Sequence, residues 1–209
     1  MKIILIRQAE TDMQWETRCD AASFERAVET DLASRAAPCA VRQNDAASYR
    51  IYTGTCPAAM DTAAMLFACS EPPISTSLLD DVPLRAFEDT GASRPLWMWR
   101  IMGQAQWFFG SARQPESRQD TTSRVMRFVD RLETEDRDCV VICRGLVMAT
   151  LKSVLRSRGY LLEGGDLLPK PLERVRATKK SLHCGGCHHN CLLSDPKCQI
   201  GQNKARGLR

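Results

Sequence analysis

Residues 3–11 read Ile-Ile-Leu-Ile-Arg-Gln-Ala-Glu-Thr. Four apolar residues in succession, three of them β-branched, favour a strand that is buried on both faces of a sheet. The apolar run ends at Arg7, so it is too short for a secretory segment or a membrane span. In open α/β sheets, ligands bind beyond the carboxyl ends of the strands, which is where Arg7 and Gln8 fall.

Strands and helices alternate along most of the chain. Further strands are predicted over residues 49–53, 74–79 and 139–143, with an edge strand over 174–179. Helices are predicted over 24–36, from 57 onward, over 95–109 as one or two helices, over 117–135, and from 145 onward. This alternation predicts an α/β fold, a three-layer sandwich of a mostly parallel sheet with helices on both faces.

Length and composition fit one globular domain with an appendage. The chain has 209 residues, of which 44% are hydrophobic and 26% charged, both ordinary values for globular proteins. We predict an α/β domain over residues 1–169 and a basic, cysteine-rich tail over 170–209. No stretch approaches 18 apolar residues, so a cytoplasmic protein is expected and a membrane partner is not. The stretch with Trp97, Trp99 and Trp107 is expected in the core or as a pocket cap, with an interface as the alternative.

The cysteines divide into two groups. Six of the ten are scattered and are expected to be small buried hydrophobes. The other four crowd into 15 residues as C-x2-C-x3-C-x6-C, namely Cys184, Cys187, Cys191 and Cys198. Four thiolates so close together predict a tetrahedral metal site of structural type, a small metal knuckle. Zinc is the preferred metal, and an iron–sulfur cluster is the alternative.

The tail is also basic. From Lys170 onward nine Lys and Arg residues face two acidic ones, a net charge of +7, whereas the rest of the chain carries −3. Such a tail is either simply solvated or attracted to nucleic acid or an acidic protein. The nucleic-acid interpretation is weak, because no aromatic residue for base stacking follows Tyr160.

Two arginines lie at predicted strand ends. Arg7 closes the first strand, and Arg144 follows the strand over 139–143. Together with helix N-termini they would form a pocket for an anion such as phosphate, since the guanidinium fork donates to two oxygens. The alternative is that they are ordinary surface arginines paired with Glu10 or Glu88.

Several motifs resemble the histidine phosphatase (phosphoglycerate mutase-like) superfamily. Residues 7–11, Arg-Gln-Ala-Glu-Thr, are similar to the family's Arg-His-Gly-Glu-Thr. Residues 52–63 resemble its second segment, residues 83–86 its Leu-x-Glu element, and residues 140–145 its strand followed by Ser-His-Gly. The match covers roughly residues 1–160 in the right order, and it implies a phosphoglycerate mutase-like fold.

The resemblance also indicates what is missing. The family's first pocket arginine falls on Arg7 and is retained. Its nucleophilic histidine falls on Gln8, its second arginine on Ala58, its acidic proton donor on Ala86 and its second histidine on Arg144. Glu88 or Asp89 could approach the space of the missing acid. The chain's three histidines, at positions 183, 188 and 189, all lie in the tail.

These losses predict that catalysis by the family mechanism is absent. A glutamine amide can hydrogen-bond a phosphate oxygen but cannot attack phosphorus, and loss of a nucleophile alone costs on the order of 10⁶ in turnover. We therefore expect no catalytic residues and an anion site of Arg7, Gln8 and Arg144, which would bind a phosphate-containing small molecule, or else a protein partner. The alternatives are an active phosphoric monoester hydrolase with rewired residues, and a metal-tail accessory protein for nucleic acid or redox chemistry.

Overall fold

A six-stranded mixed sheet forms the centre of the protein. The computed structural model describes residues 1–39, 49–67, 72–165 and 170–179. The strand order is β4-β3-β6-β1-β8-β7. These strands are β1 (Lys2–Arg7), β3 (Arg50–Thr53), β4 (Ile74–Ser75), β6 (Cys139–Cys143), β7 (Tyr160–Glu163) and β8 (Arg174–Lys179). The first four strands of that order run parallel, whereas β8 is antiparallel to both β1 and β7.

Helices cover both faces of the sheet, as the alternating pattern predicted. On one face, Ile3 and Leu5 of β1 pack with α4 (Arg118–Glu135) and α5 (Gly145–Ser157). On the other face, Ile6 packs with α2 (Pro57–Leu66). Alternate residues of β1 thus enter different hydrophobic clusters, which explains why the strand is apolar without interruption. The predicted α/β sandwich is confirmed.

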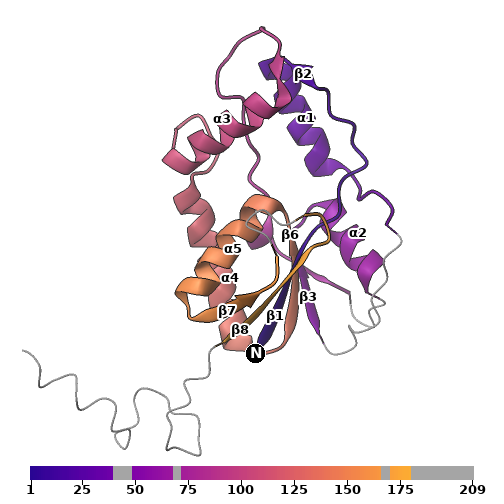
Figure 1. Cartoon of the computed structure of the whole chain (residues 1–209), viewed down its shortest axis with the longest axis vertical. Coiled ribbons are helices and arrows are strands. Elements are labelled where there is room, and N and C mark those ends of the chain that lie inside the picture. Colours follow the sequence, from indigo (N-terminus) through magenta and orange to yellow (C-terminus); the bar gives the residue numbers. More distant parts are fainter. Residues whose placement is uncertain (40–48, 68–71, 166–169, 180–209) are drawn as a thin grey trace, which may run out of the picture.

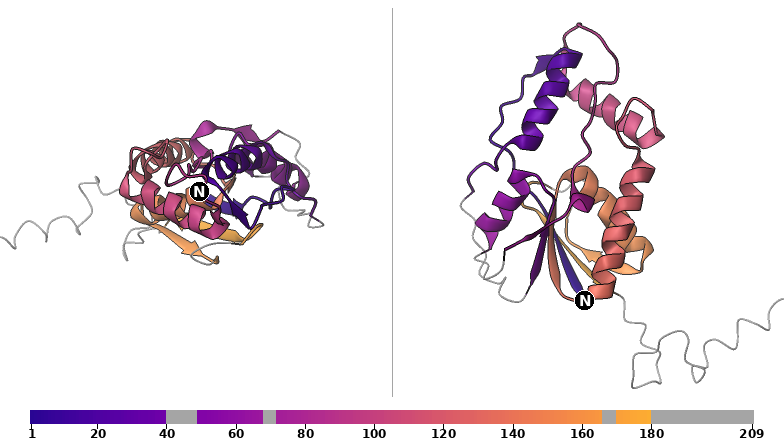
Figure 2. Two further views of the ribbon diagram at one scale, coloured as in Figure 1. Left: turned by 90° about the horizontal axis from the view of Figure 1, so that it is seen from above. Right: turned by 180° about the vertical axis from the view of Figure 1, so that it is seen from behind.

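A cap lies above the carboxyl ends of the parallel strands. It consists of α1 (Ala21–Ala33), α3 (Leu96–Phe109) and a short ribbon of β2 (Arg18–Cys19) with β5 (Arg94–Pro95), as Figures 1 and 2 show. The cap has its own cluster, in which Phe24 of α1 stacks on Trp99 of α3 at 5.8 Å between ring centroids. The indole N–H of Trp99 donates to the carbonyl of Cys19 at 2.9 Å. This cap lies across the space above the strand ends (Figure 1).

Two local predictions were wrong. Residues 74–79 form only the two-residue strand β4, followed by a 3₁₀ helix over Ser77–Leu79. The side chain of Thr76 accepts a hydrogen bond from the backbone N–H of Leu78, which favours this turn over a longer strand. The strand over 174–179 is present, but it lies between β1 and β7, so β7 is the edge strand. Residues 174–179 of the predicted tail therefore belong to the sheet as β8. Residues 180–209 lie outside the described residues.

The tryptophan stretch forms a single helix, α3, and its side chains divide. Trp99 and Trp107 are buried, as predicted, but Trp97 is exposed. Of the scattered cysteines, Cys19, Cys139 and Cys143 are buried, whereas Cys39 and Cys56 are only partly buried. Within the described residues, no helix is long and apolar enough to cross a membrane.

Candidate functional site

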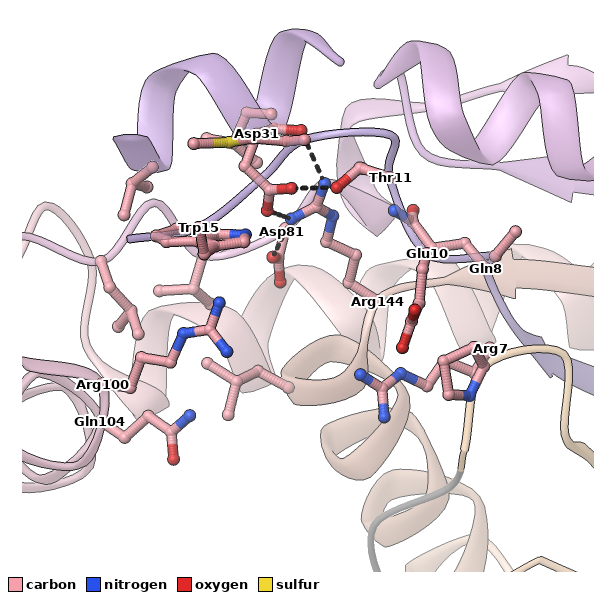
Figure 3. A pocket seen from close by; sticks show the side chains of 18 of the residues that line it. Arg7, Gln8, Glu10, Thr11, Trp15, Asp31, Asp81, Arg100, Gln104 and Arg144 are labelled. Atoms are coloured by element: carbon pink, nitrogen blue, oxygen red, sulfur yellow. Dashed lines mark hydrogen bonds and ion pairs between the residues drawn. The ribbon is translucent and has the colours of Figure 1, made fainter. Parts of the chain in front are cut away.

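A cavity of about 420 Å³ lies between the strand ends and the cap. Residues from the end of β1, from α1, from the segment after the 3₁₀ helix, from α3 and from the start of α5 line it, as Figure 3 shows. The three residues predicted for the anion site, Arg7, Gln8 and Arg144, all line this cavity. The fold therefore brings the predicted residues to one place.

Arg144 is held by two carboxylates. It is the N-cap residue of α5, and its guanidinium lies 2.5 Å from Asp31 Oδ2 and 3.7 Å from Asp81 Oδ2. It also donates to the backbone carbonyl of Asp31 at 2.9 Å. Thr11 donates to the other oxygen of Asp31, so that carboxylate is bonded on both sides. Arg144 thus joins the sheet to the cap rather than pairing with Glu10 or Glu88.

Asp81 occupies an unfavourable position for a charged carboxylate. Its side chain is only 16% exposed, and its Oδ1 is buried with no hydrogen-bond partner among the described residues. Burial raises the pKa of Asp81 to about 6, because desolvation outweighs the attraction of Arg144. Asp81 therefore changes charge in the mildly acidic range.

Gln8 is fixed inside the fold. Its side chain is 5% exposed, and its Oε1 accepts a hydrogen bond from the thiol of Cys56 at 3.3 Å. Its backbone N–H donates to the carbonyl of Cys143 at 3.0 Å, which attaches the end of β1 to the end of β6. The amide at this position is a hydrogen-bonding group and has no nucleophilic atom.

The neighbouring thiols are not activated in place of an imidazole. Burial is the main cause that raises the pKa of Cys56, and it outweighs the opposing attraction of Arg144. Burial also raises the pKa of Cys143, well above the ordinary value. A thiol must ionise to attack, and a raised pKa keeps it protonated at neutral pH. Neither cysteine lines the cavity.

The two alanines that replace the family's second arginine and its acid are packed in the interior. Ala58 and Ala86 are completely buried, and neither lines the cavity. Thr62 donates to the carbonyl of Ala58 at 2.6 Å and accepts from the backbone N–H of Ala9 at 3.0 Å, so this side of the site is closed by short contacts.

The acidic residues that follow Ala86 do not take its place. Glu88 pairs with Arg94, and Asp89 pairs with Arg113. Neither Glu88 nor Asp89 lines the cavity. The general acid that the family resemblance implies therefore has no substitute from this segment.

Arg7 and Arg100 supply the other positive charges of the cavity. The guanidinium of Arg7 lies beside the first residue of α5, since a Cβ added to Gly145 would be 3.9 Å from the Cζ atom of Arg7. Arg100 of α3 projects from the cap, with its Cζ 4.4 Å from the centroid of the Trp15 ring. Burial lowers the pKa of Arg100, which nevertheless stays protonated at neutral pH.

The charges of the lining are balanced when all groups are ionised. Three arginines face three carboxylates, namely Arg7, Arg100 and Arg144 against Glu10, Asp31 and Asp81. The sequence motifs did not predict Arg100, Asp31 or Asp81. Arg100 directly follows Trp99 on the predicted helix, and this position could have suggested that Arg100 flanks the interior of the cap. No sequence motif marks Asp31 or Asp81.

Metal-ligand clusters are not found in the part of the chain that the structure describes. No group of three or more His, Cys, Asp or Glu side chains there could hold a metal ion. The predicted ligands Cys184, Cys187, Cys191 and Cys198 lie outside those residues, so the metal site stays a prediction.

Comparison with known proteins gives structural neighbours only. Neither a protein-family model nor a curated protein sequence matches the chain. Among solved structures, phosphoserine phosphatase from Entamoeba histolytica shares 14% identity over 75% of this chain and 80% of that one, with a TM-score of 0.49. Alpha-ribazole phosphatase from Shigella flexneri shares 17% identity over 83% of this chain and 96% of that one, with a TM-score of 0.48.

A mycobacterial glucosyl-3-phosphoglycerate phosphatase is a third such structure. It shares 18% identity over 74% of this chain and 81% of that chain, with a TM-score of 0.44. These proteins belong to the histidine phosphatase superfamily, which is the family that the sequence motifs resemble.

The raised pKa of Asp81 predicts a pH dependence of stability. A group whose pKa is higher in the folded state stabilises the fold at low pH and loses this contribution as the pH rises through the folded value. Relative to Asp81→Asn, the wild type should lose on the order of 2 kcal/mol between about pH 4 and pH 6. Urea unfolding of both proteins across this range measures the difference.

Asp120→Asn provides a control of opposite sign. Hydrogen bonds from the backbone N–H and the hydroxyl of Ser117 lower the pKa of Asp120 at the start of α4, so its contribution is lost as the pH falls below the ordinary value of 3.8 and stays nearly constant between about pH 4 and pH 6. A constant difference between the wild type and Asp81→Asn from pH 4 to pH 7 would contradict the assigned environment of Asp81.

Proposed function

We propose that this protein is a non-catalytic relative of the histidine phosphatases that binds a small phosphate-type anion in the cavity above the sheet. The observation that carries the proposal is the position of Gln8, a buried amide bonded to a protonated thiol where the resemblance implies the attacking imidazole. Every histidine of the chain lies at residue 183 or beyond. A chain without a nucleophile at this position has lost the covalent step.

The anion is proposed to lie between Arg7 and the first turn of α5. Arg144 caps α5 without a side-chain bond to its N–H groups, and the first N–H groups of a helix have no intrahelical partner. The Arg7 guanidinium beside Gly145 adds a positive charge at the same point. Helix N–H groups and an arginine are the two donors that proteins most often offer to phosphate.

Arg144 has a different part in this proposal. Its charge is already shared by Asp31 and Asp81, so it contributes less positive potential than its place in the motif implies. Its main effect is to hold α1 and the segment of Asp81 against the sheet. Arg100, on the opposite wall beside Trp15, adds the second positive group that faces the cavity.

An active phosphatase with rewired residues is the alternative. Such an enzyme would need a carboxylate to activate water. Both oxygens of Asp31 already accept hydrogen bonds, so Glu10 and Asp81 are the remaining carboxylates that line the cavity. Asp81 is paired with Arg144, which withholds its carboxylate from a substrate, and Glu10 is exposed to solvent. This arrangement favours binding over hydrolysis.

The first prediction of this proposal concerns turnover. Purified wild-type protein should hydrolyse phenyl phosphates and sugar phosphates no faster than a preparation without the protein, because none of the described cavity residues is a nucleophile placed to attack phosphorus. Gln8→His should restore little activity, since Ala58 and Ala86 stay buried and uncharged. Substantial wild-type turnover that follows the protein through purification would overturn the proposal.

The second prediction concerns binding. Isothermal titration with inorganic phosphate should detect a site that Arg7→Gln weakens about tenfold or more, since a charge-assisted hydrogen bond contributes about 1.5–3 kcal/mol. Arg127→Gln, which removes an exposed arginine of α4 outside the cavity, is the matched control and should change the affinity less than twofold. Equal affinity in all three proteins would place phosphate elsewhere.

We also propose that the four cysteines of the tail bind one metal ion, zinc before an iron–sulfur cluster. Four thiolates satisfy tetrahedral zinc and leave no position for a substrate, so the ion would organise the tail rather than react. The tail's basic charge would then direct the protein to an acidic protein surface or, as the weaker alternative, to nucleic acid.

Elemental analysis of the purified chain tests this site. We expect one zinc ion per chain, with no visible absorption, and loss of the metal in the Cys184→Ser, Cys187→Ser double variant. The Cys19→Ser, Cys39→Ser double variant, which changes two cysteines outside the tail, should keep the metal. A brown protein with iron and sulfide would instead support the cluster, and a metal-free chain purified without chelators would refute both.

A further inference from the structure

The outward side of α3 is apolar although it faces solvent. Trp97 is 62% exposed, Ile101 56%, Met102 41%, Phe108 50% and Phe109 83%. Isolated apolar residues are common on protein surfaces, but five on one short helix form a patch.

Helical geometry places these residues opposite the buried side of the helix. Trp99, Gly103 and Trp107 recur every four residues and face the interior, where the indole N–H of Trp107 donates to Thr121 at 2.9 Å. Trp97 and Ile101 are offset from that stripe by about half a turn. A helix that is apolar on two opposite sides is normally buried on both.

The polar residues of α3 are confined to its flanks. Arg100 and Gln104 line the cavity, and Gln106 donates to the carbonyl of Phe87 at 2.9 Å. The outward side between Trp97 and Phe109 therefore carries no charge. Next to it, Arg118 lies over the ring of Phe108, with its Cζ 4.5 Å from the centroid.

We propose that this outward side of α3 is a homodimer interface, in which α3 of a second copy packs antiparallel to it across a twofold axis near Met102. In this arrangement Trp97 of each copy lies near Phe108 of the other. The uncharged middle of the outward side of one α3 contacts the same surface of the second α3. A twofold contact places each surface against its own copy, so a charged patch would repel itself and an uncharged apolar one does not.

The exposed area is consistent with a weak dimer. With full side-chain areas of about 150–250 Å², the five residues expose roughly 600 Å² per protomer. Two copies would remove up to about 1,200 Å² from water, which is the lower limit of specific interfaces. We therefore expect reversible, concentration-dependent association rather than an obligate dimer.

The chain's own tail is a poorer occupant. After Lys179 it has no aromatic residue, and its charge is predominantly positive. Arg100 and Arg118 flank the outward side of α3, so a basic segment would be repelled there.

Sedimentation velocity of the full chain tests the proposal, over about 1–200 µM, the range suited to an interface of this size. The wild type should shift from monomer to dimer across the series. Ile101→Glu and Ile101→Lys should each stay monomeric, because like charges meet near the twofold axis. An equimolar mixture of these two variants should recover the dimer, since opposite charges then face each other.

Leu161→Glu is the matched control, because it adds the same charge to a side chain of β7 that is 46% exposed and distant from α3. It should dimerise like the wild type, and circular dichroism should show that all variants are folded.

A wild type that stays monomeric throughout, or a dimer that survives both single substitutions, would overturn the proposal. If the wild type stays monomeric but co-sediments with anionic lipid vesicles, and Ile101→Glu abolishes that co-sedimentation, the surface binds a membrane and the proposal is overturned. Phosphate binding is measured separately, so a failure of either proposal is distinguishable from a failure of the other.

Discussion

The position of the Arg144 guanidinium between Asp31 and Asp81 is the constraint on which the site depends. It joins the start of α5 to α1 and to the segment below the cap, with its nearest contact at 2.5 Å. Removing one partner of such a group leaves the others charged and partly buried, which typically costs about 3–5 kcal/mol. The geometry of the cavity therefore cannot be separated from its charge balance, because the ion pairs that hold the cap in place also neutralise the arginine.

That balance changes what the cavity can do. A pocket that stabilises a transferring phosphoryl group needs excess positive charge where negative charge develops. Here three lining arginines are opposed by three lining carboxylates, and the buried Gln8 is bonded to Cys56. The proposed anion position, the start of α5 with Arg7 beside it, offers helix N–H donors and a positive charge.

The sequence predicted the parts of this structure that depend on local pattern. Continuous apolar runs predicted β1 and β6, and helical spacing predicted α4 and α5. The position of β8 between β1 and β7 was not predictable in this way, because its alternating burial resembles that of an edge strand. Asp31 was also missed, since it is 113 residues from Arg144 and only the folded chain brings the two together. Motif resemblance placed Arg7, Gln8 and Arg144 at one cavity, yet it gave no information on the carboxylates around them.

The helix α3 connects the two proposals physically. Arg100 and Gln104 line the cavity on one flank, and Ile101, the adjacent residue, belongs to the outward side. Because one rigid helix carries both surfaces, any ligand that fixes α3 over the cavity also fixes the orientation of its outward side. By linkage, if such a ligand changes the association constant of two chains by some factor, association changes the affinity for the ligand by the same factor. The cap, rather than the sheet, is therefore the element through which binding and self-association would influence each other.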